Sequence, residues 1–413
     1  MLKSTAIKVT QLSREARISR GIVFKFLDSL RNGRLIVEEK FADSGHGTQF
    51  QFGEISGEVS AEGVITIFDE SVYSRILKGG SIAAAEAYIE GLWDSPDLTL
   101  LTQLMAANAD TLDRIEAKTS WLTSLYYRLG HFMKRNSLVR AKENIHAHYD
   151  IGNSFYQLFL DEKMLYSSAL FEAQNESLGE AQINKLKRLC EQLELKPSDH
   201  VIEIGTGWGA MAVYMAEHYG CRVTTTTISE EQYHYVKNLV ESKGLGERIT
   251  LLNQDYRELK GKYDKLVSIE MIEAVGKQYL NGYIEKCNEL LNPRGKMAIQ
   301  AITIADQRYE SYSRNVDFIQ KYIFPGGFLP SINALLNSTS SHSEFNLRCV
   351  KDIGLDYAQT LKYWRERFEQ QIEKVRAQGY DERFIRMWRY YLCYCEGGFL
   401  SKSISTVQLT FEK

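Results

Sequence analysis

The chain has 413 residues, 44% hydrophobic and 25% charged, which is enough for a folded core and for two domains. Its formal net charge is −3, so no overall basic charge indicates a nucleic-acid partner. Six cysteines are scattered without C-x-x-C pairs, which argues against a zinc site and against a disulfide framework. No signal-type apolar core and no run of membrane-spanning length occurs, so we expect a cytoplasmic protein.

The first part of the chain, residues 1–117, is predicted to form a smaller α+β domain. Apolar residues at helical spacing predict a basic amphipathic helix from Arg14 to Asn32. This helix either docks on its own domain, the simpler interpretation, or lies on a lipid surface. Residues 47–70 alternate and predict a small antiparallel β unit. Helices follow from Ser71 to about Ala117, interrupted at Gly79-Gly80 and near Pro96.

Residues 118–145 are predicted to form a linker helix. From Lys118 to Lys142 the chain carries six basic residues and no acid, together with Trp121, Tyr126 and other aromatics. This composition suits the headgroup region of an anionic membrane. It suits equally well a helix that packs between two domains.

Residues 146–413 are predicted to form a Rossmann-like α/β domain with a mostly parallel, doubly wound sheet. Strand and helix patterns alternate from Val201 to Ile302, as expected for consecutive βαβ units. An aromatic-rich insertion, about residues 305–400, interrupts this domain, and a closing strand follows at Thr406–Phe411.

The run Val201-Ile-Glu-Ile-Gly-Thr-Gly-Trp-Gly209 joins a strand to a helix and is the centre of this domain. Gly205 and Gly207 allow a ligand to approach the backbone closely. Glu203 lies inside the motif, and the next strand ends in Thr227-Ile-Ser229 rather than in the carboxylate of a dinucleotide site. The motif therefore favours an NAD site less than a site for another small ligand.

Polar residues follow the later strands, where ligands of such sheets bind. They are Thr227-Ile-Ser-Glu-Glu-Gln232, Asp255-Tyr-Arg257 and Ile269-Glu-Met-Ile-Glu273. Hydroxyls, an amide, a carboxylate and an aromatic ring at these positions suit a nucleoside.

Several motifs in this order give the chain a specific resemblance. They are His148-Tyr-Asp-Ile-Gly-Asn153, Met164-Leu-Tyr-Ser-Ser168, the glycine motif, Gln254-Asp-Tyr-Arg257, Ile272-Glu-Ala-Val-Gly276, Lys321-Tyr-Ile-Phe-Pro-Gly-Gly-Phe-Leu-Pro-Ser331 and Asp356-Tyr357. Together they resemble the cyclopropane fatty acid synthases, which include mycolic acid modifying enzymes and belong to the class I S-adenosylmethionine (SAM) methyltransferases. The resemblance extends to Gly80–Trp93 and so covers nearly the whole chain.

The resemblance implies methyl transfer from SAM to the cis double bond of an unsaturated phospholipid acyl chain, giving a cyclopropane through a carbocation. Aromatic faces stabilise cations, and the candidates are Tyr149, Phe155, Tyr166, Phe324, Tyr357 and Tyr390. The implied SAM-binding residues are Tyr149, Tyr166, Ser167, Glu203, Gly205, Gly207, Thr227, Ile228, Ser229, Gln232, Asp255, Tyr256, Arg257 and Ile269.

In this family the base that closes the ring is a bound bicarbonate. The resemblance assigns Glu273, Tyr357 and Ile302 to its binding, together with the positions of Ser168 and Gln300. Ser168 stands where the family has cysteine, and Gln300 where it has histidine. A glutamine still donates hydrogen bonds but cannot carry positive charge beside an anion.

Two products therefore stay open: a cyclopropane, or a methyl- or methylene-branched chain if the altered site redirects the cation. Two other functional classes stay open. A non-catalytic lipid-binding protein would fail to bind SAM, and a small-molecule methyltransferase would not bind anionic vesicles. The expected partners are an unsaturated, anionic phospholipid bilayer at the inner face of the membrane, a second copy of the chain in a homodimer, and a downstream reductase. No metal is expected.

Overall fold

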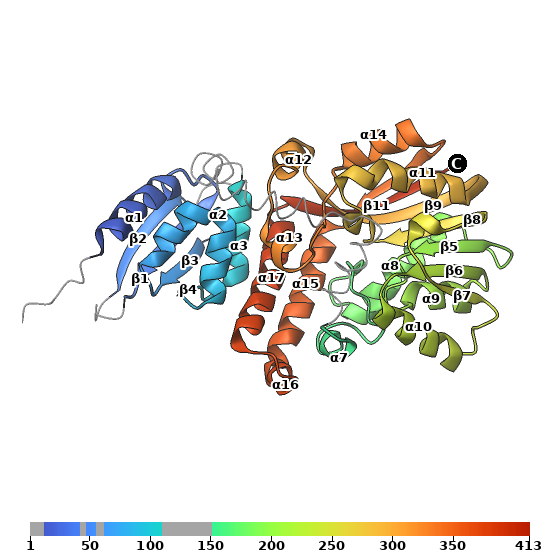
Figure 1. Ribbon diagram of the computed structural model, residues 1–413, viewed down its shortest axis with the longest axis horizontal. Helices are drawn as coiled ribbons and strands as arrows, with labels where there is room; N and C mark the ends of the chain where they lie inside the picture. The colour runs from blue at the N-terminus through green and yellow to red at the C-terminus, as the bar shows by residue number, and fades with distance from the viewer. Residues whose placement is uncertain (1–11, 42–46, 55–61, 110–150) are drawn as a thin grey trace, which may run out of the picture. The chain divides into compact units, whose positions relative to one another are not determined.

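The computed structural model describes residues 12–41, 47–54, 62–109 and 151–413 (Figure 1). These residues form two compact units. The first contains the described residues up to 109 together with Asn315–Phe318 and Gly379–Ser403. The second contains the described residues from 151 to Arg314, then Ile319–Gln378 and Ile404–Lys413. Residues 118–145, the predicted linker helix, lie outside the described residues.

The first unit is built on a four-stranded sheet with the order β2-β1-β3-β4. Its elements are α1 Arg14–Leu27, β1 Gly33–Glu39, β2 Thr48–Glu54, β3 Glu62–Ile67, α2 Ser71–Ile89, β4 Trp93–Asp94, α3 Leu98–Ala107 and α17 Glu382–Leu400. The predicted break in α2 is confirmed, because Gly80 leaves helical geometry with φ 59° and ψ −145°. The β unit predicted for residues 47–70 contains β2 and β3, but these strands do not pair with each other as expected. Strand β1, which lies outside that range, stands between them, antiparallel to β2 and parallel to β3.

Helix α17 belongs to this first unit, although the sequence places residues 379–403 in the second domain. Its partner is α3, and the two helices approach closely at Gly397, where a side chain would collide with Thr102. Thr102 Oγ1 also donates a hydrogen bond to the Cys393 carbonyl oxygen at 2.8 Å, and Thr99 Oγ1 to Glu396 Oε2 at 3.2 Å. A helix pattern shows that α17 has an apolar face but not which unit covers that face.

The second unit contains a seven-stranded sheet with the order β10-β11-β9-β8-β5-β6-β7. The strands from β9 to β7 are parallel, whereas β11 runs antiparallel to both β9 and β10. The strands are β5 His200–Ile204, β6 Arg222–Thr227, β7 Ile249–Asn253, β8 Tyr263–Ile269, β9 Leu291–Ile304, β10 Asn346–Asp352 and β11 Ile404–Glu412. The predicted Rossmann-like α/β sheet is therefore confirmed, and the strand order reverses at β5.

Helices cover both faces of this sheet (Figure 1). One face carries α11 and α14, and the other carries α8, α9 and α10. The helices of this unit are α7 Asn153–Tyr156, α8 Leu178–Leu193, α9 Ala210–His218, α10 Glu230–Ser242, α11 Leu280–Leu290, α12 Asp306–Tyr312, α13 Phe318–Tyr322 (from Ile319 onward), α14 Ile332–His342, α15 Gly354–Gln370 and α16 Ile372–Ala377.

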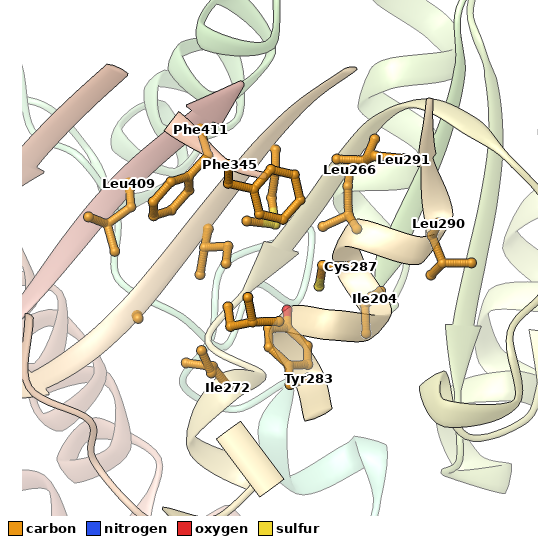
Figure 2. Packing of buried hydrophobic residues seen from close by; sticks show 14 of the residues in the cluster. Ile204, Leu266, Ile272, Tyr283, Cys287, Leu290, Leu291, Phe345, Leu409 and Phe411 are labelled. Atoms are coloured by element: carbon orange, nitrogen blue, oxygen red, sulfur yellow. The ribbon is translucent and has the colours of Figure 1, made fainter. Parts of the chain in front are cut away.

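The core beneath α11 and α14 is continuous from β5 to the closing strand. Figure 2 shows Tyr283 and Cys287 of α11 facing Ile204 and Leu266, with Phe411 further along the sheet. All five side chains are at most 6% exposed. This packing holds the carboxyl ends of β5 and β8 side by side, where the site lies. Among the described residues, no helix combines the length and the apolar character needed to cross a bilayer.

Candidate active site

The glycine motif forms a tight turn between β5 and α9. Gly205 and Gly207 have φ angles of 98° and 54°, which favour glycine. The backbone N–H groups of Gly205 and Thr206 donate to the Thr226 carbonyl oxygen at 3.2 and 3.0 Å and so tie the turn to β6. A Cβ at Gly207 would meet no heavy atom within 4 Å. The turn therefore presents open space to a ligand.

Glu203 lies at the end of β5 beneath this turn and is only 3% exposed. Thr225 Oγ1 donates a hydrogen bond to Glu203 Oε2 at 2.6 Å, and Thr206 and Thr225 hydroxyl oxygens lie 2.6 Å apart. Burial raises the pKa of Glu203 to about 8. The glutamate is thus protonated near neutral pH until a ligand offers it further donors.

The ends of β6 and β7 place the predicted nucleoside-binding side chains in two small hydrogen-bonded clusters. Thr227 Oγ1 donates to Gln232 Oε1 at 2.8 Å and accepts from the Ser229 N–H at 3.1 Å. Asp255 forms a close ion pair with Arg257, with Nη2 and Oδ2 2.6 Å apart. This guanidinium occupies both carboxylate oxygens of Asp255, so hydrogen bonding to an adenine would use their remaining lone pairs.

The loop after β8 carries two glutamates, Glu270 and Glu273, and touches the glycine turn. An added Cβ at Gly205 would lie 3.1 Å from Met271 Cγ, so the two segments are in van der Waals proximity. Glu270 adopts φ 48°, a left-handed conformation that non-glycine residues rarely occupy. Such backbone strain persists where surrounding interactions hold it, and it is frequent at functional sites.

Three donors hold the Glu270 carboxylate. Oε1 accepts from the Ser168 backbone N–H at 2.9 Å and from Gln300 Nε2 at 2.8 Å. Oε2 accepts from the Tyr357 hydroxyl at 2.9 Å. Burial raises the pKa of Glu270, whereas these hydrogen bonds and the charge of Lys185 oppose that rise.

A hydrogen-bond chain behind Gln300 fixes its amide. Gln300 Oε1 accepts from Gln408 Nε2 at 3.0 Å, and Gln408 Oε1 accepts from Arg188 Nε at 3.0 Å. Gln300 Nε2 also donates to the Ser168 carbonyl oxygen at 3.2 Å. The amide hydrogens of Gln300 therefore point at Glu270 and at Ser168.

Glu273 is held differently. Its Oε1 accepts a hydrogen bond from the Ile302 N–H, whereas its buried Oε2 has no hydrogen-bond partner among the described residues. Burial, followed by the charge of Glu270, raises the pKa of Glu273 to about 8. Of the two glutamates, Glu270 is the better stabilised as an anion.

A fully buried lysine lies near Glu270 and carries a charge that favours its ionised form. Lys185 of α8 has no exposed surface, and its Nζ donates to Ser167 Oγ at 2.7 Å. Burial lowers the pKa of Lys185 to about 8, and the charges of Glu270 and Asp161 oppose that change. Ser167, expected to bind SAM, therefore also anchors this lysine.

Aromatic rings of the second unit cluster beside the glycine turn. Trp208 of the turn lies 5.1 Å from the ring centroid of Tyr156, and Tyr166 lies 5.2 Å from Trp364. The rings of Phe155, Phe324 and Tyr357 join the same cluster through 5.8–6.4 Å centroid contacts. A dry aromatic wall of this kind suits an apolar substrate on which positive charge develops.

The structure thus brings together most of the residues predicted from the sequence. Glu273, Ile302, Ser168, Gln300 and Tyr357 converge at the ends of β8 and β9. Ile228, Tyr256 and Ile269 occupy the strand ends beside the other expected SAM contacts. Tyr149 lies outside the described residues. Tyr390 does not join this cluster, because it belongs to the first unit, where it packs on Tyr88 and Phe318.

Sequence reasoning missed Glu270, Lys185 and the tryptophans Trp208 and Trp364 as site residues. Glu270 directly follows the last residue of β8, at the sheet edge where ligands bind, and this position was the available signal. The residues present fit SAM, because the turn offers open space above a buried carboxylate. They do not fit a bound bicarbonate, because Ser168, Gln300 and Tyr357 already hold Glu270.

The sheet order, the glycine turn and the acidic residue beneath it define a class I SAM-dependent methyltransferase. Residues 136–409 match the mycolic acid cyclopropane synthetase family, and the chain belongs to that family. It is 36% identical to a tuberculostearic acid methyltransferase of Mycobacterium tuberculosis, over 83% of this chain and 81% of the relative.

Two further comparisons agree with this assignment. The cyclopropane-fatty-acyl-phospholipid synthase of Escherichia coli is 34% identical, over 87% of this chain and 90% of the relative. The crystal structure of a mycolic acid cyclopropane synthase complexed with SAH and CTAB superposes with a TM-score of 0.63 at 29% identity. That superposition covers 66% of this chain and 98% of the other.

Proposed function

We propose that this chain transfers the methyl carbon of SAM to the cis double bond of an unsaturated phospholipid acyl chain. The main support for this function is the contact between the glycine turn and the loop after β8. The glycine turn, with its open space at Gly207, touches Met271 in the loop that presents Glu270 and Glu273. A sulfonium methyl held at the turn would therefore face the carboxylates and the aromatic rings.

In this proposal, the binding of the nucleoside and the stabilisation of the cation fall to different side chains. Glu203 and the polar residues at the ends of β6 and β7 bind the nucleoside. Tyr166, which is partly exposed and packs on the fully buried Trp364, excludes water and offers its face to a cation. SAM supplies an electrophilic methyl group when it is bound. An alkene is a weak nucleophile, so alignment and dryness account for most of the rate that the site must supply.

The first candidate product is a cyclopropane, as the sequence predicts. The similarity to the Escherichia coli synthase supports it. A methyl- or methylene-branched chain is the second candidate, and a specific observation favours it: the groups expected to hold bicarbonate bind Glu270 instead. Two relatives are named as methyltransferases of tuberculostearic acid and of fatty acids, which also supports the second candidate.

We further propose that the chain works at the surface of an anionic bilayer, on the cytoplasmic side. Helix α1 exposes Ile18 and Ile22 by 56% and 37% beside Arg14 and Lys25, an apolar and basic surface that suits lipid headgroups. A homodimer is proposed from the resemblance alone. A downstream reductase would be needed only if the product retained a double bond.

The test is chromatography with mass spectrometry of acyl chains after incubation of the protein with SAM and vesicles of cis-unsaturated phospholipid. A cyclopropane and a methylene branch each add one CH₂, so catalytic hydrogenation and retention time must separate them. Either product supports methyl transfer to the double bond. Absence of any added carbon, with SAM binding intact, would refute the proposed function.

A further inference from the structure

The Glu270 carboxylate occupies a ready-made anion site. Its two oxygens receive a backbone N–H from Ser168, an amide hydrogen from Gln300 and the hydroxyl of Tyr357, all within 2.9 Å. Three of the five groups that the resemblance implies for bicarbonate are therefore used by a side chain of this protein.

The backbone at Glu270 shows that this arrangement comes at an energetic cost. The residue is held at φ 48°, where glycine is favoured and a longer side chain is strained. The hydrogen bonds of the carboxylate offset that strain, since hydrogen bonds to a charged group are stronger than those between neutral groups. A glycine at this position would be relaxed and would leave the three donors facing an empty anion site.

We propose, on the basis of the function proposed above, that the Glu270 carboxylate takes the place of bicarbonate as the base of the reaction. The alkene π pair forms a C–C bond to the methyl carbon as the C–S bond breaks, and the thioether leaves as a neutral molecule. The other alkene carbon then carries the positive charge. Glu270 removes one proton from the transferred carbon and becomes a neutral acid.

The electron pair of the broken C–H bond completes either product. It closes the three-membered ring if the proton leaves directly. If a 1,2-hydride shift first moves the charge to the carbon that bears the methyl group, the same pair forms the C=C bond of a methylene branch. In both cases the proton resides on Glu270, and the turnover requires no dissolved bicarbonate.

The experiment compares wild type with E270Q and E270G in CO₂-free buffer under argon and in the same buffer with added bicarbonate. SAM and vesicles of dioleoyl phosphatidylglycerol are the substrates, and acyl products are quantified by mass spectrometry. E194G is the matched control, because Glu194 is also a left-handed glutamate, with φ 52°, at the exposed C-cap of α8. SAM calorimetry and melting temperature verify that each variant is folded.

Wild type and E194G are expected to turn over equally in both buffers. E270Q should lose about 100-fold or more in turnover, the usual contribution of a general base, while still binding SAM. E270G should be similarly slow without bicarbonate and should recover at least tenfold when bicarbonate or formate is added. Carbon-13 NMR of labelled bicarbonate should show binding to E270G and none to wild type.

Wild-type turnover that falls in CO₂-free buffer, or E270Q turnover within threefold of wild type, would overturn the assignment of Glu270. Absence of product from wild type in both buffers would instead refute the proposed function. In that case the NMR measurement still tests whether Glu270 occupies the bicarbonate site. Labelled bicarbonate bound to wild type contradicts the inference, and binding to E270G alone supports it.

Discussion

Substituting Gly207 by alanine tests whether the glycine turn is the SAM cradle. The residue has φ 54°, and an added Cβ would meet no heavy atom within 4 Å. The protein itself therefore pays only the strain of a left-handed alanine, about 1–2 kcal/mol. A loss of this size lowers the melting temperature of a domain by no more than a few degrees.

The same methyl group should have a larger effect on the ligand. If SAM lies against the backbone at Gly207, the methyl group overpacks the interface by about 1–3 kcal/mol, which corresponds to an affinity loss of about 5- to 150-fold. Gly244 provides the control, because it has φ 65° and an equally open Cβ position in the turn after α10. G244A should cost similar stability and leave SAM affinity unchanged.

Isothermal titration of SAM, together with the melting temperature of each variant, measures both quantities. SAM affinity in G207A within twofold of wild type would show that the ligand does not approach this turn. An equal loss in G207A and G244A would mean that backbone strain, rather than contact with SAM, sets the affinity.

Three further predictions concern the carboxylates. Y357F removes one donor from ionised Glu270, so the pKa of Glu270 rises and the acidic limb of the kcat/KM profile should move up by about one pH unit. Ser168 contributes its backbone N–H, so S168A should change turnover less than threefold. Q300A leaves buried groups unpaired and should lower the free energy of unfolding by about 1–3 kcal/mol. Glu203, with a pKa near 8, holds a proton that the unfolded chain releases near pH 4.5, so the thermal stability of the free protein should fall as pH rises between these values. Ribose hydroxyls favour the ionised form of Glu203, so SAM affinity should rise over the upper part of this range in calorimetry, and E203Q should remove that dependence.

The parts of the fold that could be predicted are those in which local pattern and burial agree. The buried run of β5, the glycine turn and α9 follow from periodicity and from the need for positive φ. Strand β10 was missed because all its side chains are exposed or partly exposed, so this edge strand shows no alternating apolar face. Strand β1 lies outside the β unit predicted at residues 47–70, and its parallel pairing with β3 was missed as well, since alternation indicates a strand but neither its neighbour nor the neighbour's direction.

Some residues of the candidate site could likewise be predicted from the sequence, and others could not. Positions at the strand ends follow from the general rule for open parallel sheets, and the motifs of the resemblance supply Glu273, Ile302 and Tyr357. The role of Glu270 could not be predicted, because its partners come from three separate segments: the loop at Ser168, β9 and α15. Only the folded chain shows that their donors converge on one carboxylate.

Two glutamates three residues apart cannot both be ionised cheaply in a site of low polarity, and their surroundings separate their roles. Burial raises the pKa of Glu270, but three donors and the nearby charge of Lys185 oppose that rise, so Glu270 is the better placed of the two to hold a negative charge. Burial, followed by the repulsion of Glu270, raises the pKa of Glu273 to about 8, and its Oε2 has no hydrogen-bond partner in the part of the chain that the structure describes. A base and an acid thus lie within one turn of the loop after β8. When Glu270 accepts a proton, its repulsion of Glu273 disappears, which lowers the pKa of Glu273 in part, while burial, the larger cause, continues to raise it. The second glutamate thereby limits the change of net charge in the loop while positive charge is being removed from the acyl chain.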